Sequence, residues 1–300
     1  MIKEKKRRKD MTGYLFIAPA IIFFLVFIVY PIGFISYGSL FNWSSLSNMT
    51  FVGLKNFVEL FQDKVFIITL RNTLLWILIT ITIQMVLGFI LAYIIEEKVK
   101  KYKSFFRTLF FIPVVTSVVV ISIVWSNMYS PYQGLLTNFL YSIGFGSPIN
   151  LLGDVNKAIF AIMVVNIWEW TGWSMILYIA GLSEISQGIK EAALIDGAKG
   201  FKKIYHIFIP LTAHVHKSLV LLGIIGSLQT FALVYSMTSG GPNSATEVPG
   251  TYIFKMGFQV QRMGYASAIS VIILLLALVL TVMQVVTLGS GNFISKKGGK

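Results

Sequence analysis

The sequence has no cysteine and very little charge. The absence of Cys from all 300 residues excludes a disulfide framework, a thiolate metal site and a thiol nucleophile. Asp, Glu, Lys and Arg make up 12% of the chain, about half of the roughly 25% usual in soluble proteins. Hydrophobic residues make up 56%. Such a composition cannot cover the surface of a water-soluble protein, so it indicates a membrane protein.

Six apolar segments are long enough to cross a bilayer, which takes about 20 helical residues. They are expected at residues 14–37, 70–95, 109–128, 158–182, 216–237 and 265–288. We therefore predict an all-α polytopic membrane protein with six transmembrane helices. Its transmembrane domain would cover residues 14–288, with a basic tail at 1–13 and a C-terminal tail at 289–300.

Basic residues are concentrated in alternate connecting segments. Segments 1–13, 96–108, 183–215 and 289–300 contain six, five, four and three Lys and Arg residues, whereas the opposite segments together contain five. By the positive-inside rule, both termini and the loop 183–215 are expected in the cytosol. The net charge of +13 is then a topology signal with some attraction to anionic membrane lipid, and nucleic-acid binding is not expected.

The loop 183–215 contains the polar stretch EAALIDGAKGFKKIYHIFIPL at residues 191–211. Helix formers over 189–195, breaks at Gly197 and Gly200, and a second short helix over 201–208 that Pro210 closes predict a helix-turn-helix on the inner membrane face. Ala192 and Ala193 would leave a shallow surface for a docking protein. Asp196 is a candidate cap of the second helix. A solvated connection without further role is the alternative.

This stretch resembles the EAA loop of ATP-binding-cassette (ABC) importer permeases, whose pattern is E-A-A-x-x-x-G, nine residues, then I-x-L-P. The matching residues are Glu191, Ala192, Ala193, Gly197 and the run from Ile207 to Pro210, with Ile209 in place of Leu. Further segments are similar to the carbohydrate branch of these permeases, which includes the maltose, glycerol-phosphate and multiple-sugar permeases; they lie at 15–20, 30–43, 51–57, 105–113, 227–247 and 265–271. The resemblance implies the type I importer fold.

The resemblance also implies a role and partners. The chain would be a bacterial cytoplasmic-membrane permease that imports a sugar or oligosaccharide and forms half of the pore. A second, homologous permease would complete the pore, an extracytosolic sugar-binding protein would deliver the substrate, and two cytosolic ATPases would bind the loop at Glu191, Ala192, Ala193, Asp196 and Gly197. The chain contains no G-x-x-x-x-G-K-[ST] phosphate loop, so ATP hydrolysis would belong to the partners and the chain would not be an enzyme.

Polar residues within a span usually face a cavity or the protein interior. In the span 158–182, Asn166, Glu169, Trp170 and Trp173 fall within about 100° of one another on a helix, whereas Trp168 points elsewhere. Polar groups suit sugar hydroxyls, and indoles stack on the apolar faces of pyranose rings. These four residues match positions that line the sugar site of the similar maltose permease. Alternatively, the tryptophans are interface anchors or packing residues, and Asn166 caps a helix contact.

The next span offers a second polar wall. Ser227 and Thr230 share one helix face with Gly223 and Gly226, and the family resemblance supports both hydroxyls as substrate-binding residues; Gln229 lies off this face. Close helix packing through small residues is the alternative. Thr116 and Ser117, which follow Pro113, could join the site or bond to backbone carbonyls near the proline.

No cofactor or metal site is expected. His206, His214 and His216 are spaced by eight and two residues, which does not place them on one helix face, and surface or interfacial positions are favoured. A competing function is an ion- or proton-coupled secondary transporter that acts without an ATPase. That class is indicated by internal repeats with interrupted helices in corresponding halves, and neither is visible in the sequence.

Overall fold

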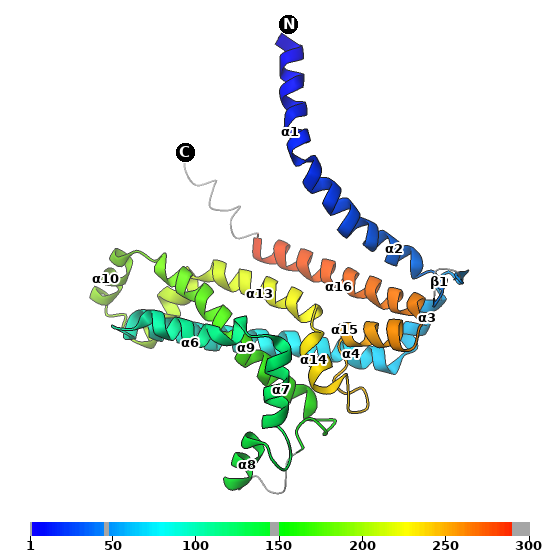
Figure 1. Ribbon diagram of the computed structural model, residues 1–300. Coiled ribbons are helices and arrows are strands. Elements are labelled where there is room, and N and C mark those ends of the chain that lie inside the picture. The colour runs from blue at the N-terminus through cyan, green and yellow to red at the C-terminus, as the bar shows by residue number, and fades with distance from the viewer. Residues whose placement is uncertain (1, 45–47, 145–149, 290–300) are drawn as a thin grey trace. The chain divides into compact units, whose positions relative to one another are not determined.

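The computed structural model describes residues 2–44, 48–144 and 150–289, and it is almost entirely helical (Figure 1). Contacts divide the chain into two compact units. The first consists of Met1–Asp63 with Ile253–Leu274, and the second of Lys64–Tyr252 with the chain from Leu275 onward. Helices α15 (Pro249–Phe254) and α16 (Met263–Gly289) each contribute residues to both units.

Four helical runs are long and apolar enough to cross a membrane, namely Gly13–Gly38, Lys64–Lys98, Ala158–Ser183 and Met263–Val286. The first run contains α1 (Ile2–Phe24), the π-helical turn η1 (Leu25–Val29) and α2 (Tyr30–Gly38). The second contains α4 (Lys64–Trp76), η2 (Ile77–Ile81), α5 (Thr82–Tyr93) and η3 (Ile94–Lys98). The third is α9 (Ala158–Ser183) and the fourth is α16. The predicted all-α membrane fold is confirmed, and these four spans lie close to their expected positions.

The other two predicted spans are bent. Helices α6 (Lys103–Val115) and α7 (Val118–Met128) meet at 93°, and the helical run Phe201–Leu211 meets α13 (Ala213–Leu228) at 67°. The continuous helix expected over 109–128 is therefore wrong. The 67° bend at Thr212 lies before the span expected over 216–237, but that span is divided, because α13 ends at Leu228 and a separate helix α14 (Ala232–Thr238) follows. If each bent pair is one crossing, the described chain has up to six spans.

The bend between α6 and α7 lies at Thr116 and Ser117, where the backbone is extended. The amide of Thr116 donates to the carbonyl of Pro113, and its hydroxyl donates to the carbonyl of Ile112 at 2.8 Å. Carbonyls at a helix end within a membrane need such partners because water is absent from the bilayer core. Of the two alternatives given for Thr116, the structure therefore favours bonding to backbone carbonyls near the proline over a place in the substrate site.

Helix α9 is the centre of the second unit and packs against α5, α6, α13 and α14. Two of these contacts are made at backbone distance. A Cβ at Gly172 would lie only 2.0 Å from the carbonyl oxygen of Phe110 in α6, and a Cβ at Gly88 in α5 would lie 2.6 Å from the Cβ of Ser174. Small residues are how membrane helices approach this closely. The absence of side chains at Gly172 and Gly88 thus sets the positions of α5 and α6 on α9.

Two clusters of buried apolar side chains lie along α9. One collects around its first turns and contains Trp76, Ile162, Val165 and Val234, among others. The other collects around its last turns and contains Phe89, Met175, Tyr178, Phe208 and Leu219, among others. The turns of α9 between the two clusters carry several polar side chains.

The first unit contains a short strand pair that the sequence did not predict. After α2 the chain forms an antiparallel ladder of β1 (Phe41–Asn42) and β2 (Thr50–Phe51), in which Phe41 pairs with Phe51, and then enters α3 (Lys55–Gln62). Asn56 is 5% exposed and its Nδ2 donates to the carbonyls of Ser39 and Phe41 at 2.8 and 3.0 Å. The side chain thereby fixes the turn of the chain after α2.

An ion pair ties α3 to the start of α16 within the first unit. Arg262 donates to Glu59 Oε2 at 2.7 Å, and this hydrogen bond lowers the pKa of the Glu59 carboxyl from its ordinary value. Next to it, the Tyr265 hydroxyl donates to Asp63 Oδ2 at 2.6 Å. A short helix, α8 (Leu135–Ser142), and a π-helical turn, η5 (Lys255–Gln259), lie outside these runs.

The close contact at Gly172 gives a test of the packing. We expect Gly172→Ala to destabilise the protein by about 1–3 kcal/mol or more, because its Cβ would meet backbone that cannot rotate away. Gly33→Ala is the matched control, since Gly33 also lies in a helix but has no atom within 4 Å of its Cβ position. The midpoint of thermal unfolding in detergent should fall for the first variant only. Equal midpoints would contradict the packing described for α9 and α6.

Candidate functional site

A cavity of about 540 Å³ lies within the second unit. Its volume is in the range of about 300–1,000 Å³ that is usual for small-molecule sites. The walls come from the run α4–η2–α5, from α7, α9 and α13, and from the link into α14; the polar and aromatic lining residues are Trp76, Thr80, Gln84, Asn166, Glu169, Trp170, Trp173, Ser174, Ser227, Gln229, Thr230 and Phe231.

Helix α9 supplies the four residues that the sequence singled out. Asn166, Glu169, Trp170 and Trp173 all line the cavity, on the turns of α9 between the two apolar clusters. Trp168 is not among the lining residues; its ring packs against Trp125 in α7 with centroids 5.5 Å apart. The helical-face argument therefore sorted these residues correctly, because α9 is a regular helix over its whole length.

Asn166 is held in place by a partner from the neighbouring span. Gln84 Nε2 donates to Asn166 Oδ1 at 3.0 Å and to the carbonyl of Asn166 at 3.2 Å. Because this bond uses the side-chain oxygen, the amide nitrogen of Asn166 is the group that can donate to a ligand. Gln84 itself lines the cavity but was missed. A polar residue in the middle of the span 70–95 was the available signal.

Glu169 puts a carboxyl group on the cavity wall. The residue is only 5% exposed, and it lies within a membrane span. Among the described residues, no basic side chain forms an ion pair with it. A carboxyl in such a position can accept hydrogen bonds from hydroxyl groups of a ligand, and polar groups at this depth usually have a function.

Helix α13 and the residues after it form the facing wall. Ser227 and Thr230 line the cavity, but their hydroxyls donate to the carbonyls of Gly223 and Gly226 at 2.7 and 3.2 Å. Toward a ligand, both hydroxyls are therefore acceptors. Gln229 also lines the cavity, contrary to the helical-face argument, because α13 ends at Leu228 and the chain then leaves the helical path.

The two glycines of α13 differ in what surrounds them. A Cβ at Gly223 would lie 2.7 Å from Ile81 Cγ1, so this glycine serves helix packing. A Cβ at Gly226 would meet no atom within 4 Å. Gly226 therefore faces open space of the cavity, and the packing alternative holds for only one of the pair.

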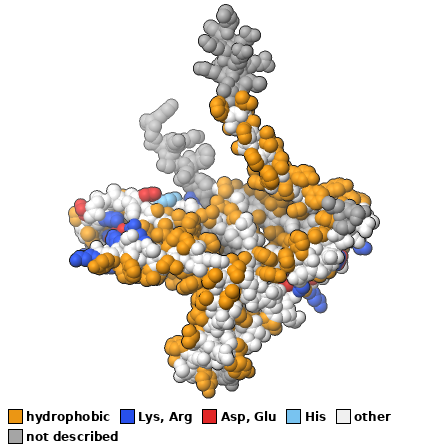
Figure 2. Space-filling model, in the orientation of Figure 1, with side chains coloured by type: hydrophobic (Ala, Val, Ile, Leu, Met, Phe, Trp, Pro, Cys, Tyr) orange, Lys and Arg blue, Asp and Glu red, His pale blue; other side chains and the backbone are white. Residues whose placement is uncertain are grey.

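The predicted helix-turn-helix is present, with different ends. Its first helix is α10 (Gln187–Ile195), and the second is formed by α11 (Phe201–Lys203), the π-helical turn η4 (Ile204–Phe208) and α12 (Ile209–Leu211). Pro210 lies in the last turn of the second helix, which ends at the next residue, Leu211, before the bend at Thr212, as expected for a proline that closes it. In Figure 2, Lys and Arg side chains gather at the end of the unit where α10 lies.

The turn between α10 and α11 is made by two glycines. Gly197 and Gly200 have φ values of +73° and +54°, which residues with a Cβ adopt only at a cost. The suggestion that Asp196 caps the second helix is wrong. Asp196 is the residue that ends α10, and Gly200, which has no side chain, precedes α11.

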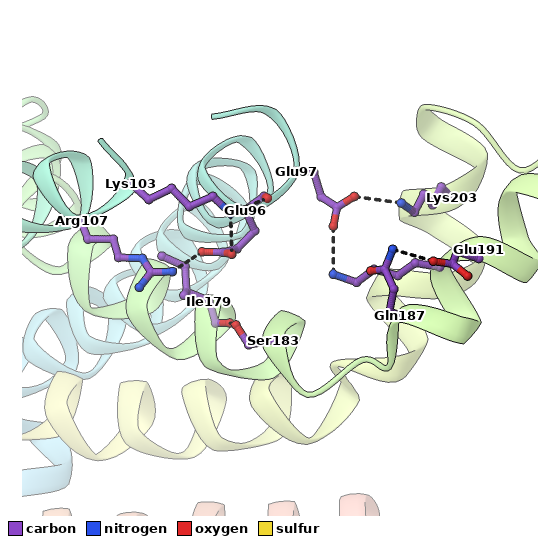
Figure 3. Close-up of polar contacts among 10 residues, drawn as sticks. Glu96, Glu97, Lys103, Arg107, Ile179, Ser183, Gln187, Glu191 and Lys203 are labelled. Carbon is purple, nitrogen blue, oxygen red and sulfur yellow. Dashed lines mark hydrogen bonds and ion pairs between the residues drawn. The ribbon is translucent and has the colours of Figure 1, made fainter. Parts of the chain in front are cut away.

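The remaining residues of the EAA stretch lie on α10. Glu191 is exposed, and Gln187 Nε2 donates to its Oε1 at 3.1 Å, one turn away (Figure 3). Ala192 is exposed, but Ala193 is only 6% exposed. The shallow surface expected from both alanines is therefore limited to Ala192, because Ala193 faces the interior of the unit.

The three histidines do not gather into one site. His216 is partly buried and bonds to the Tyr178 hydroxyl through Nδ1 at 2.6 Å, whereas His214 lies 3.3 Å from Glu184 and His206 bonds to its own helix. Within residues 2–44, 48–144 and 150–289, no group of three or more His, Cys, Asp or Glu side chains could hold a metal ion. His216 differs from the surface position expected for it, because it packs between α9 and the end of the loop.

Comparison with known proteins identifies relatives over almost the whole chain. Residues 84–287 match the family model described as "Binding-protein-dependent transport system inner membrane component". The probable ABC transporter permease protein YurN of Bacillus subtilis is 40% identical over 92% of this chain and 96% of its own. The lactose transport system permease protein LacF of Rhizobium radiobacter is 35% identical over 93% of this chain and 94% of its own.

The fold is similar to that of a solved transporter. A chain from the crystal structure of a bacterial alginate ABC transporter, in complex with an alginate pentasaccharide-bound periplasmic protein, superposes with a TM-score of 0.82. It is 25% identical, and the match covers 93% of this chain and 94% of that one.

Proposed function

Because the chain belongs to the family of binding-protein-dependent transport system inner membrane components, we propose that it forms half of the translocation pore of an ATP-driven importer for a sugar or oligosaccharide. Family membership makes the chain a multi-pass membrane permease subunit that works with a binding protein. The carbohydrate substrate is supported by two of its relatives, one named for lactose transport and one for alginate.

The cavity is the observation that carries the proposal. It lies among membrane spans, and it combines indole rings with an amide, a carboxyl and hydroxyl oxygens. The indoles of Trp170 and Trp173 offer flat apolar surfaces to pyranose rings, while Asn166 and Glu169 offer a donor and an acceptor to hydroxyl groups. Ser227 and Thr230 add acceptors from the facing wall. We propose that these six residues bind the substrate on its way through the membrane.

The cavity can be tested by truncation of its lining. We expect Trp173→Ala and Asn166→Ala each to lower the rate of sugar uptake about tenfold, because a lost buried polar or stacking contact costs about 1–3 kcal/mol. Uptake of labelled saccharides into proteoliposomes that contain the complete transporter and its loaded binding protein measures the effect. Complex assembly, followed by co-purification, should be unchanged.

Trp168→Ala is the matched control, since this tryptophan lies on the same helix and packs outside the cavity. It should transport at the rate of the unmodified chain. If both cavity variants transported normally, the substrate would follow another surface and the assignment of the six residues would fail.

We propose that cytosolic ATPases bind the loop and that a second, homologous permease completes the pore. We propose that Glu191, Ala192, Asp196 and Gly197 form the contact with a cytosolic ATPase, two of which serve the complete pore, and that the buried Ala193 supports this surface from inside the unit. Glu191 and Ala192 are exposed on α10, as a docking surface requires. A carboxylate there can form a charge-assisted bond with a basic residue of the partner, which is stronger than a neutral bond.

Charge reversal on α10 tests this contact. Glu191→Lys should weaken ATPase binding and lower transport at least about tenfold, since a hydrogen bond to a charged group contributes about 1.5–3 kcal/mol. Glu184→Lys is the control, because Glu184 is also exposed and lies at the start of the same loop, before α10 begins. ATPase retained on the affinity-purified complex and uptake per complex are the measurements. Normal uptake by Glu191→Lys would contradict the docking role and leave the loop as a connecting segment only.

We propose that both termini and the loop 183–215 face the cytosol. The distribution of Lys and Arg supports this orientation. The structure adds that two of the segments expected inside lie together, because Glu97 contacts Lys190 and Lys203 of the loop.

Single cysteines in the cysteine-free chain test the orientation. Lys199→Cys should resist a membrane-impermeant thiol reagent in intact cells and react after the cells are opened. Lys55→Cys and Lys157→Cys, at exposed positions in segments expected outside, should react in intact cells. The reverse pattern would overturn the orientation.

A secondary transporter that acts without an ATPase is not supported. The matched family is defined by dependence on a binding protein, and the relatives are permease components of transport systems. No observation on the described residues favours an ion-coupled mechanism over this one.

A further inference from the structure

Glu97 occupies an unusual place at the end of the span Lys64–Lys98. Its Oε1 lies 3.0 Å from Lys190 Nζ, which belongs to α10, and its Oε2 lies 2.9 Å from Lys203 Nζ, which belongs to α11. One carboxylate thus holds both short helices of the loop, each with one of its oxygens. Figure 3 shows Glu97 between the end of its own helix and the loop.

These ion pairs are partly shielded from water, with Glu97 and Lys190 each 19% exposed in their side chains. Lys203 is 8% exposed, and its Nζ lies 4.8 Å from the centre of the Phe208 ring, while Lys190 Nζ lies 5.9 Å from the same ring. Phe208 itself is fully buried in the apolar cluster that contains Tyr178 of α9. The buried ammonium of Lys203 therefore depends on Glu97 for charge compensation, and the half-buried ammonium of Lys190 does so in part.

The loop has few other means of fixing its geometry. α10 is nine residues long and the second helix covers only Phe201–Leu211, and such short helices are not stable alone in water. The turn between them is built on Gly197 and Gly200, around whose Cβ positions no atom lies within 4 Å. Backbone hydrogen bonds close the end of α10, and side-chain contacts such as those of Glu97 add to them in holding the two helices together.

The neighbouring carboxylate has different partners. Glu96 accepts from Lys103 at 3.1 Å and from Arg107, and both of these belong to α6 rather than to the loop (Figure 3). The two adjacent glutamates therefore connect the end of one span to two different neighbours. Glu96 fixes it to α6, and Glu97 fixes it to the loop.

We propose that Glu97 is the positioning residue that transmits movement of the loop to the cavity. It locks α10 and α11 into one body and joins that body to a helix whose middle carries the cavity residues Thr80 and Gln84. A displacement of the loop then shifts this span together with Gln84, the residue that holds Asn166. The inference rests on the proposed function, in which an ATPase moves the loop.

The test compares Glu97→Gln with Glu96→Gln in the complete transporter. Glutamine keeps the shape of the side chain but removes its charge. Glu97→Gln should therefore accelerate amide hydrogen exchange at least about tenfold in peptides that cover residues 187–208. The reason is that a hydrogen bond to a charged group changes an equilibrium constant by more than about tenfold. Glu96→Gln removes an equivalent charge one residue away and should leave exchange in these peptides unchanged. Sugar transported per ATP hydrolysed should fall for Glu97→Gln and not for Glu96→Gln.

A double variant separates positioning from general damage. In Glu97→Gln with Lys203→Gln the two amides can bond to each other, and the unpaired ammonium nearest to the Phe208 ring is removed while Lys190 remains, so part of the exchange protection should return. Equal exchange in the two single variants would overturn the positioning role. Faster exchange with an unchanged ratio of sugar to ATP would overturn transmission. Failure of the proposed function would be seen separately, as an unmodified complex that transports no saccharide.

Discussion

Close approach of neighbouring helices to α9 is the constraint on which the second unit depends. Lipid tails are as apolar as Leu or Ile side chains, so the hydrophobic effect gives little reason for spans to associate inside a bilayer. Packing at backbone distance must therefore hold the spans together. Gly172 of α9 permits this packing against α6, and Gly88 of α5 permits it against α9. Because α9 is fixed from both sides, the polar face it carries has one definite orientation.

The membrane also restricts how polar side chains can be used. Most hydroxyls in the spans donate to a carbonyl four residues earlier in their own helix, as Thr73, Thr80 and Thr171 do. Such bonds satisfy the donor without any neighbour, so they carry little information about function. The pair of Gln84 and Asn166 differs, because it joins two spans, and Glu169 differs because its carboxyl lines a cavity. These exceptions mark the candidate site.

The cavity and the loop lie in the same unit and share helices. The run Lys64–Lys98 lines the cavity at Gln84 and holds the loop at Glu97, while the second helix of the loop continues through a 67° bend into α13, which lines the opposite wall. Two walls of the cavity are therefore connected to one loop by separate routes. A force applied to α10 has a physical path to both.

The sequence by itself determined the class of the protein. Hydropathy, the distribution of Lys and Arg and the spacing of the EAA stretch predicted a helical membrane permease, because each of these signals is local or cumulative along the chain. The face of α9 was also predictable, since a regular helix converts spacing into direction. Tertiary structure alone decided the bends at Thr116 and Thr212, the end of α13 that brings Gln229 to the cavity, the burial of Ala193 and the contact of His216 with Tyr178. It also decided the partners of Glu97, which lie 93 and 106 residues away in the chain. Contacts over such distances depend on how helices pack, and no spacing within one helix encodes them.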